Sequence, residues 1–314
     1  FDAAVFTNLA PEHLNFHASM REYAAAKARL FEMLDTPTGK QWLRMGVVNA
    51  DDPASVTMAS ASPAGIVSYA LDNPADVMAR RIELGISGSR FRLITPVGEM
   101  GIETRLVGRH NVSNWLAAAA VALGWGIDLD IVAEAAATAS PPPGRMQRVQ
   151  VGAPFKVVID FAHTPQALSA TLDALRPFTE GRLLLVFGMA GGRDPTNRPR
   201  MGEIAANKAD FFVISTDDPI HEDPEEIAAA VAAGARGAGA VHGDHFVVEL
   251  DRRKAIELAM ARAVAGDIVL LAGKGHEMRM LVGDHSEPWS DLDAARDILA
   301  SLGHGERDRG SAGS

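Results

Sequence analysis

The second half of the chain alternates short apolar runs with helix-forming stretches, and this alternation constrains the fold more than any other feature. The apolar runs begin near residues 157, 182, 211, 245 and 268, and the helical patterns between them cover residues 166–175, 200–208, 223–236 and 251–264. Alternation with such short connections predicts βαβ units and a mainly parallel sheet. The sequence therefore indicates an α/β fold.

Four of these apolar runs end in loops that carry charged residues or pairs of glycines. The loops cover residues 160–165, 188–194, 216–219 and 272–277. In an open parallel sheet, ligands bind in the crevice outside the carboxyl ends of the strands. We therefore expect the four loops to share one site for an anionic and a cationic ligand.

Each charged loop residue has a functional and a structural interpretation. Asp160 could accept hydrogen bonds from a ribose diol or cap the next helix. Asp217 and Asp218 could hold an ammonium group, although Asp-Pro is also ordinary turn chemistry. Glu277 is a second candidate partner for an ammonium group, and Arg193 is a candidate clamp for a carboxylate.

The first half of the chain is mixed. It opens on a strand-like stretch, continues with a helix near residues 21–34 and five short strands, and ends with helices near 112–123 and 130–139. The proline triplet before Gly144 cannot continue a helix, so it predicts a linker and a domain boundary after residue 142. A closing helix is expected at 291–302, and the polar, glycine-rich tail predicts disorder.

Lys27 lies in an otherwise apolar stripe of the first predicted helix. Ser19 and Glu22 form a capping-box pattern that opens this helix. A lysine that reaches to solvent from a half-buried face is one interpretation. The alternative is a lysine with a chemical task, since burial lowers the pKa of an amine and makes it nucleophilic. His13, just upstream, is a weak candidate metal ligand.

Three further polar residues lie near a helix start or the linker. Asn111 and Asn114 are one turn apart and could either cap the alanine-rich helix or bind a ligand at its N-terminus. Arg145 could reach a phosphate or be an ordinary surface arginine. The sequence contains no G-x-x-x-x-G-K-[ST] phosphate loop.

Composition limits the classes of partner. The formal net charge of −10 argues against a broad nucleic-acid surface. The chain has no cysteine, which excludes disulfides and thiolate chemistry. No apolar run approaches the ~20 residues of a membrane span. We expect a cytoplasmic protein that binds neither nucleic acid nor membrane, and the strand-like opening on Phe1 indicates a fragment.

Taken together, these segments resemble the Mur ligase family, and most closely its MurE type. The matching stretches are residues 6–9, 12–14, 27–31, 108–114, 144–146, 160–165, 188–201, 217–219 and 273–277. Each stretch is weakly specific, whereas their order and spacing together are highly specific. The resemblance implies that residues 1–142 are a central ATPase domain lacking its phosphate loop. It also implies a Rossmann-like, amino-acid-binding domain at 143–303, with 304–314 as a disordered tail.

The resemblance also implies a reaction. ATP and Mg²⁺ would convert the carboxylate of UDP-N-acetylmuramoyl-L-alanyl-D-glutamate, the UDP-N-acetylmuramoyl-dipeptide, into an acyl phosphate, which the amine of a diamino acid attacks. The implied metal ligands are His13 and a carbamylated Lys27, and the implied catalytic residues are Lys27 and Arg145. The implied nucleotide contacts are Asn111, Asn114, Asp160 and His163. The implied amino-acid contacts are Arg193, Asp218, Ile220, Gly273 and Glu277.

One departure from the family pattern bears on specificity. Enzymes that add meso-diaminopimelate usually carry Asp-Asn-Pro-Arg, whereas this chain has Asp-Asp-Pro-Ile at residues 217–220. Ile220 cannot pair with a distal carboxylate, and an extra carboxylate at Asp218 favours an ammonium group. We therefore expect L-lysine or L-ornithine as the substrate.

Two alternatives stay open. The chain could be a non-catalytic binding protein with the same fold. It could also be a cyanophycin-synthetase-like or folylpolyglutamate-synthetase-like amide ligase. Without a phosphate loop, the polypeptide as given is expected not to turn over ATP.

Overall fold

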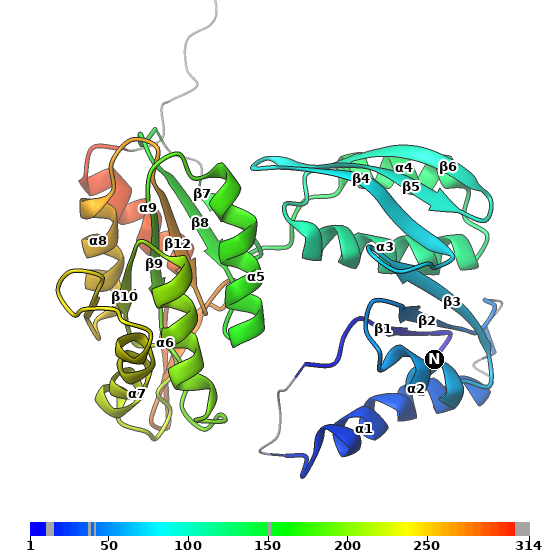
Figure 1. Ribbon diagram of the computed structural model, residues 1–314, viewed down its shortest axis with the longest axis horizontal. Helices are drawn as coiled ribbons and strands as arrows, with labels where there is room; N and C mark the ends of the chain where they lie inside the picture. The colour runs from blue at the N-terminus through cyan, green and yellow to red at the C-terminus, as the bar shows by residue number, and fades with distance from the viewer. Residues whose placement is uncertain (11–15, 37–38, 41, 150–151, 305–314) are drawn as a thin grey trace, which may run out of the picture. The chain divides into compact units, whose positions relative to one another are not determined.

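The computed structural model describes residues 1–10, 16–36, 39–40, 42–149 and 152–304. The chain divides into two compact units, Phe1–Ser140 and Pro141–Ser314 (Figure 1). This division lies two residues before the boundary that the sequence predicts. The α/β class is confirmed in both units. The predicted tail lies, from residue 305 on, outside the described residues.

The first unit is built on a six-stranded sheet in the order β1-β2-β3-β4-β5-β6. Its strands are β1 (Ala3–Phe6), β2 (Met45–Asn49), β3 (Gly65–Ala70), β4 (Val77–Gly85), β5 (Gly88–Thr95) and β6 (Gly98–Thr104). The first four strands run parallel, and the last two continue as an antiparallel meander. Every residue of β2 is buried, as expected for a parallel strand covered on both faces.

Among the described residues of this unit, five helical segments pack on the sheet. They are α1 (Met20–Glu32), η1 (Met33–Asp35), α2 (Ser55–Ala61), α3 (Arg109–Gly124) and α4 (Leu129–Thr138). One apolar cluster joins α1 and α2 to β1 and β2 through Phe31 and Met58. A second joins α3 to β2–β6 through Trp115 and Leu116. The predicted start of α1 is confirmed, because Ser19 Oγ accepts a hydrogen bond from Glu22 N at 3.2 Å.

The second unit contains the predicted parallel sheet, in the order β11-β10-β9-β12-β8-β7. Its strands are β7 (Gln147–Val149), β8 (Lys156–Asp160), β9 (Leu183–Phe187), β10 (Phe211–Ile214), β11 (Phe246–Val248) and β12 (Ile268–Ala272). Only the edge strand β7 is antiparallel within this sheet. A separate hairpin is formed by β13 (Arg279–Val282) and β14 (His285–Pro288).

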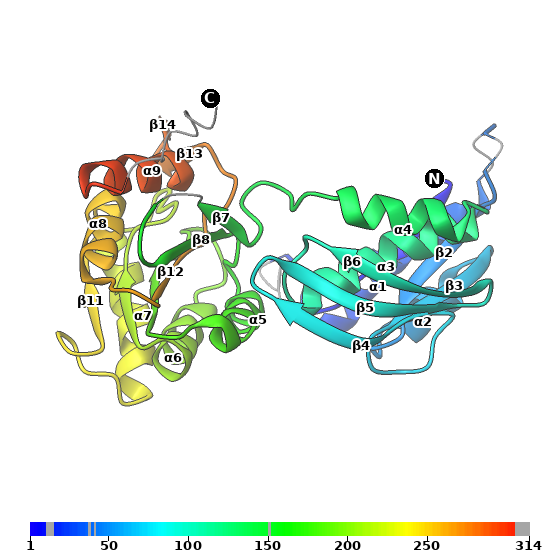
Figure 2. The same cartoon turned by 90° about the horizontal axis from the view of Figure 1, so that it is seen from above.

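Helices cover both faces of this sheet (Figures 1 and 2). They are α5 (Pro165–Leu175), which continues into η2 (Arg176–Phe178), α6 (Asn197–Lys208), α7 (Pro224–Gly237), α8 (Arg252–Arg262) and α9 (Asp291–Ser301). Helices α5, α6 and α7 pack side by side in sequence. Helices α8 and α9 share an apolar cluster with β8, β9, β10 and β12. This two-faced arrangement leaves the carboxyl ends of the strands open for a site.

Glycines let two neighbouring helices of this unit approach each other closely. A Cβ atom at Gly202 of α6 would collide with the carbonyl oxygen of Val231 on α7, and one at Gly234 of α7 would collide with that of Pro199 on α6. None of the helices within the described ranges has the length and apolar character that crossing a membrane requires.

Candidate active site

The four charged or glycine-rich loops lie together at one edge of the second sheet, as expected. Strands β10, β9, β12 and β8 are direct neighbours, so their carboxyl ends are adjacent. Gly191 N donates to Asp218 O at 2.7 Å, which joins the loops after β9 and β10. Gly273 N donates to Asp160 O at 3.1 Å, which joins the loops after β12 and β8.

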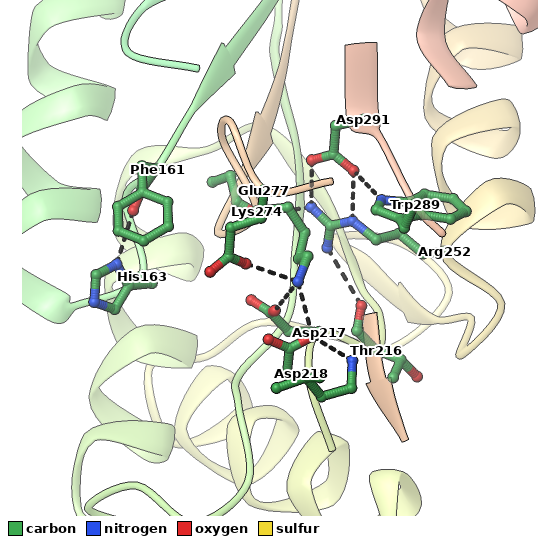
Figure 3. A network of polar contacts seen from close by, with 12 residues as sticks. Phe161, His163, Thr216, Asp217, Asp218, Arg252, Lys274, Glu277, Trp289 and Asp291 are labelled. Atoms are coloured by element: carbon green, nitrogen blue, oxygen red, sulfur yellow. Dashed lines mark hydrogen bonds and ion pairs between the residues drawn. The ribbon is translucent and has the colours of Figure 1, made fainter. Parts of the chain in front are cut away.

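A buried lysine occupies the centre of this edge. The side chain of Lys274 is fully buried, and its Nζ lies 2.8 Å from Asp218 Oδ1, 2.7 Å from Glu277 Oε2 and 3.6 Å from Asp217 Oδ1 (Figure 3). Burial disfavours the charged amine, but the carboxylates outweigh it and raise the pKa of Lys274 above its ordinary value. We call Lys274 and these three carboxylates the ammonium cage.

The sequence predicts that these three carboxylates hold an ammonium group. In the structure they hold the ammonium of Lys274, which belongs to the chain itself. Oxygen atoms of Asp217, Asp218 and Glu277 lie within 4.8 Å of one another, a spacing that also suits a metal ion. Lys274 pairs with all three carboxylates, which favours an ammonium over a metal there. Burial raises the pKa of Asp217, against the opposing effect of Arg252 and Lys274.

Asp218 and Glu277 each keep one carboxylate oxygen open. Asp218 uses Oδ1 for both Lys274 and the amide of Leu281, at 2.8 and 2.9 Å. Glu277 uses Oε2 for Lys274. Asp218 Oδ2 and Glu277 Oε1 accept no hydrogen bond from any residue that the structure describes. The Glu277 side chain is 35% exposed, so an incoming cation can reach it.

A second buried cation lies behind the cage. The guanidinium of Arg252 donates to both carboxylate oxygens of Asp291, at 2.8 and 2.7 Å, and also to Ala272 O and Thr216 O, at 2.9 and 3.3 Å (Figure 3). Trp289 Nε1 donates to Asp291 at 2.9 Å. This network ties the ends of β10 and β12 to the start of α9, so it fixes the two loops that form the cage.

Neither buried cation is among the site residues that the sequence predicts. A usable signal for Lys274 was its place between two glycines directly after a fully apolar strand. Gly273 has φ of 107°, and a Cβ there would lie 2.7 Å from Asp217 Oδ2. Gly273 is therefore needed beside the cage.

Ile220 adopts a backbone conformation that is unusual for its residue type. Its φ is 54°, in the left-handed region that β-branched residues rarely enter. Ile220 N donates to Leu281 O at 3.1 Å, and Gly283 N donates to Ile220 O at 2.6 Å. The β13–β14 hairpin thus holds this residue in place. Its Cδ1 lies 3.8 Å from the position that a Cβ on Gly192 would take.

Arg193 follows this glycine turn and is exposed. It makes no hydrogen bond or ion pair within the described part of the chain, so its guanidinium is open to a ligand. Glu222 supports the turn, because it accepts hydrogen bonds from Gly192 N at 2.6 Å and from Arg198 at 2.7 Å. These two donors keep the pKa of Glu222 below its ordinary value.

Asp160 lies at the end of β8, where its carboxylate is 6% exposed. It accepts hydrogen bonds from Ala162 N, Thr171 Oγ1 and Met146 N at 3.1, 2.9 and 2.8 Å. The helix-capping alternative is wrong, since Thr164 caps α5. Asp160 instead ties the segment after the linker to the sheet, and a ribose contact stays a prediction.

Arg145 and His163 meet at the ring of Phe161. The Arg145 guanidinium lies 4.6 Å from the centre of this ring, in a cation–π arrangement. The rings of Phe161 and His163 are 4.6 Å apart, and His163 Nδ1 lies 2.9 Å from Phe161 O. Both residues are therefore near Asp160. Their contacts with a nucleotide stay predictions.

In the first unit, Asn111 and Asn114 do not cap α3. No side chain makes a capping hydrogen bond at this helix start. Asn111 is buried and donates to Val107 O at 2.8 Å, and Asn114 donates to Asn111 Oδ1 at 3.4 Å. The capping interpretation is therefore wrong. Asn114 is exposed, and ligand binding by either residue stays a prediction.

Lys27 is half-buried on α1, with its Nζ 4.9 Å from the centre of the Tyr23 ring. This position agrees with a lysine that extends along an apolar face, and its carbamylation stays a prediction. His13 lies outside the described residues. Within the ranges that the structure covers, the cage carboxylates are the only group of acidic or histidine side chains with metal-ligand spacing.

Comparison with known proteins identifies the class. Residues 1–122 match the Mur ligase middle domain, and residues 144–275 match the Mur ligase glutamate ligase domain. The chain belongs to the Mur ligase family and contains its middle and C-terminal domains.

Relatives within the family indicate which type of Mur ligase this chain resembles. The chain is 42% identical to a UDP-N-acetylmuramyl-tripeptide synthetase of Roseiflexus sp. (strain RS-1), over 97% of this chain and 61% of the relative. It is 41% identical to a UDP-N-acetylmuramoyl-L-alanyl-D-glutamate–2,6-diaminopimelate ligase of Geobacillus thermodenitrificans (strain NG80-2), over 94% of this chain and 60% of the relative. The predicted resemblance to the MurE type is thus confirmed. The chain spans about three fifths of the length of these relatives.

Solved structures of Mur ligases superimpose on this chain. A structure of a UDP-N-acetylmuramoyl-L-alanyl-D-glutamate–2,6-diaminopimelate ligase superimposes with a TM-score of 0.60 at 32% identity, over 96% of this chain and 61% of that one. MurF from Thermotoga maritima in complex with ADP superimposes with a TM-score of 0.70 at 14% identity, over 96% and 62% of the two chains. Because the identity to MurF is only 14%, this superposition shows the fold alone.

Proposed function

We propose that the protein containing this chain is an ATP-dependent ligase of peptidoglycan synthesis. It adds a diamino acid as the third residue to UDP-N-acetylmuramoyl-L-alanyl-D-glutamate. The observation that carries the proposal is the charge arrangement at the strand ends. The open guanidinium of Arg193 lies on the same edge as two open carboxylate oxygens, on Asp218 and Glu277. A free amino acid needs both charges at once.

The amino acid would bind by its two charged groups. Arg193 pairs with its α-carboxylate, and Glu277 and Asp218 accept hydrogen bonds from its α-ammonium. Because the amino acid is held by both charged groups, its amine is oriented toward the acyl phosphate. Such orientation supplies much of the rate acceleration of a bimolecular step. After losing a proton, the amine attacks the acyl carbon, and the C–O bond to phosphate breaks as the amide forms.

The nucleotide contacts that the family resemblance implies are kept as proposals. The proposed contacts are Asn111, Asn114, Arg145, Asp160 and His163, together with the proposed metal ligands His13 and Lys27. Bound Mg²⁺ would neutralise the phosphate charges. A phosphate loop is absent from the printed sequence, so we expect no ATP turnover by these 314 residues alone. Release of ADP by them in the presence of Mg²⁺ would refute this expectation.

We further propose L-lysine or L-ornithine, rather than meso-diaminopimelate, as the amino acid. Ile220 lies beside the glycine turn that carries Arg193. A distal carboxylate placed against this uncharged side chain would lose hydration without gaining a cationic partner. An unsatisfied charged group costs at least about 1–3 kcal/mol, which corresponds to a discrimination of roughly 5- to 150-fold.

The test is an amino-acid panel with the longest native form of the protein. ADP release and product mass are measured with L-lysine, L-ornithine and meso-diaminopimelate, for the wild type, Ile220→Arg and the uncharged control Ile220→Gln. We expect the wild type to prefer the first two. Ile220→Arg should raise kcat/KM for meso-diaminopimelate at least tenfold, and Ile220→Gln should not.

Wild-type preference for meso-diaminopimelate would overturn the substrate proposal. Absence of ADP release with every amino acid would overturn the ligase proposal and favour a non-catalytic binding protein. Turnover only with an acceptor other than the UDP-N-acetylmuramoyl-dipeptide would favour an amide ligase of the cyanophycin-synthetase or folylpolyglutamate-synthetase kind.

A further inference from the structure

The ammonium of Lys274 lies among three carboxylates. Its Nζ lies 2.8 Å from Asp218 Oδ1 and 2.7 Å from Glu277 Oε2, and Asp217 Oδ1 lies 3.6 Å away, beyond hydrogen-bond distance. The side chain has no exposed surface. Lys274 therefore has no access to a substrate or a phosphate, so any role in the reaction must act through its partners.

The contacts of Lys274 determine which carboxylate oxygens remain open. It engages one oxygen of Asp218 and one of Glu277, so the second oxygen of each is left for a ligand. Asp218 comes from the loop after β10, whereas Lys274 and Glu277 come from the loop after β12. Lys274 and Asp218 are 56 positions apart in the sequence. Without an ammonium between them, carboxylates so close would repel one another.

Charge balance leaves the cage with an excess of negative charge. It contains three carboxylates and a single ammonium, and Arg252, the nearest other buried cation, is already paired with Asp291. The excess negative charge points to a cationic ligand at the open oxygens. Lys274 itself prevents a ligand ammonium from entering the centre of the cage.

We propose that Lys274 is a positioning residue for the amine of the incoming amino acid. It holds Asp218 and Glu277 so that Oδ2 and Oε1 face the ligand side by side, while its own ammonium keeps the ligand out of the buried centre. This inference rests on the proposed function, because it assigns a role within the same amino-acid subsite.

The test compares kinetic constants of four variants with the wild type. Lys274→Met removes the charge at similar length. Asp218→Asn/Lys274→Met removes one charge of each sign, and Asp218→Asn alone is its reference. Lys254→Met is the matched control, since Lys254 is exposed and pairs with Asp251 at 3.5 Å on the surface. Turnover by the wild type tests the proposed function separately from the variants.

We expect Lys274→Met to raise KM for the amino acid at least tenfold and to change KM for ATP less than twofold. The acidic limb of the pH profile of kcat/KM for the amino acid should move to higher pH, because Lys274 is one of the two cations that lower the pKa of the cage carboxylate Asp217. A purely structural role would not move this limb. The double variant should show a KM for the amino acid at least fivefold above that of Asp218→Asn. Lys254→Met should match the wild type.

Three outcomes would overturn the proposal. They are an unchanged KM for the amino acid, equal losses for both substrates with an unshifted pH profile, and a lowered KM for the amino acid. The last outcome would mean that the ligand ammonium takes the place of Lys274. If Lys274→Met does not fold, as judged by circular dichroism, the comparison of the double variant with Asp218→Asn decides.

Discussion

Removing the partner of a buried cation should destabilise the second unit strongly, and the pair between Arg252 and Asp291 is the place to test this. Both side chains are 1% exposed or less, and they share two hydrogen bonds at 2.8 and 2.7 Å. Replacing Asp291 by asparagine keeps the shape but leaves the guanidinium without its negative partner. Its remaining acceptors are the neutral amide oxygen at position 291 and the carbonyls of Thr216 and Ala272.

Breaking a buried ion pair by removing one partner costs about 3–5 kcal/mol. Asp217 interacts electrostatically with Arg252 and supplies part of the missing charge, so we expect the lower half of this range for Asp291→Asn. With a urea dependence of about 2 kcal/mol per M, the unfolding midpoint of this unit should fall by roughly 1.5–2 M. Arg252→Met/Asp291→Leu removes both charges and should cost far less than either single change.

The same two helices supply a matched control. Arg253 of α8 and Asp297 of α9 form an exposed pair at 3.5 Å, so Asp297→Asn should change stability by less than about 1 kcal/mol. Urea unfolding is followed by hydrogen-exchange mass spectrometry on peptides from α8 and β12, which reports on this unit separately. The reasoning is refuted if Asp291→Asn costs no more than Asp297→Asn, or if the double variant costs as much as the single one.

Two further predictions concern stability elsewhere in this unit. Gly202→Ala should cost about 1–3 kcal/mol, since its Cβ meets backbone of α7, whereas Gly237→Ala meets no atom within 4 Å and should be neutral or stabilising in thermal melts. The buried carboxyl of Asp267 has its pKa raised by desolvation, but hydrogen bonds from Arg182 and Val264 outweigh this, so its pKa lies below the ordinary value. Such a group stabilises above its unfolded pKa of about 3.9, and this stabilisation is lost as pH falls through the folded pKa. Asp267→Asn should therefore lower the urea midpoint at pH 7 and have less effect near pH 3, and an equal difference at both would contradict the assignment.

The fold follows from the sequence where burial produces a regular pattern. Parallel strands buried on both faces appear as continuous apolar runs, and the helices between them begin at recognisable caps such as Thr164 and Asp223. The elements that the sequence analysis did not predict lack these signals. Helix α2 has seven residues and no side-chain cap. Strand β7 has three residues, and β14 is exposed throughout.

The site followed from the sequence only in part. The rule that polar loops gather at the carboxyl ends of parallel strands correctly placed Asp218 and Glu277 together. It did not say which charges are buried or which pair with each other. Lys274 and Asp218 are 56 positions apart, and Arg252 and Asp291 are 39 apart. Such partners are set by tertiary packing, and local spacing contains no information about them.

The buried lysine also changes the argument about amino-acid selection. Lysine and meso-diaminopimelate both carry a distal ammonium, so an extra carboxylate at Asp218 would attract either one. Asp218 is in any case already paired with Lys274. The two substrates differ in the distal carboxylate alone, and among the positions considered only Ile220 bears on that group. Its left-handed backbone is held by the β13–β14 hairpin, at a cost of about 1–3 kcal/mol for a non-glycine residue. We therefore infer that selection acts by rejecting a carboxylate at Ile220, and that the cage contributes affinity common to both amino acids.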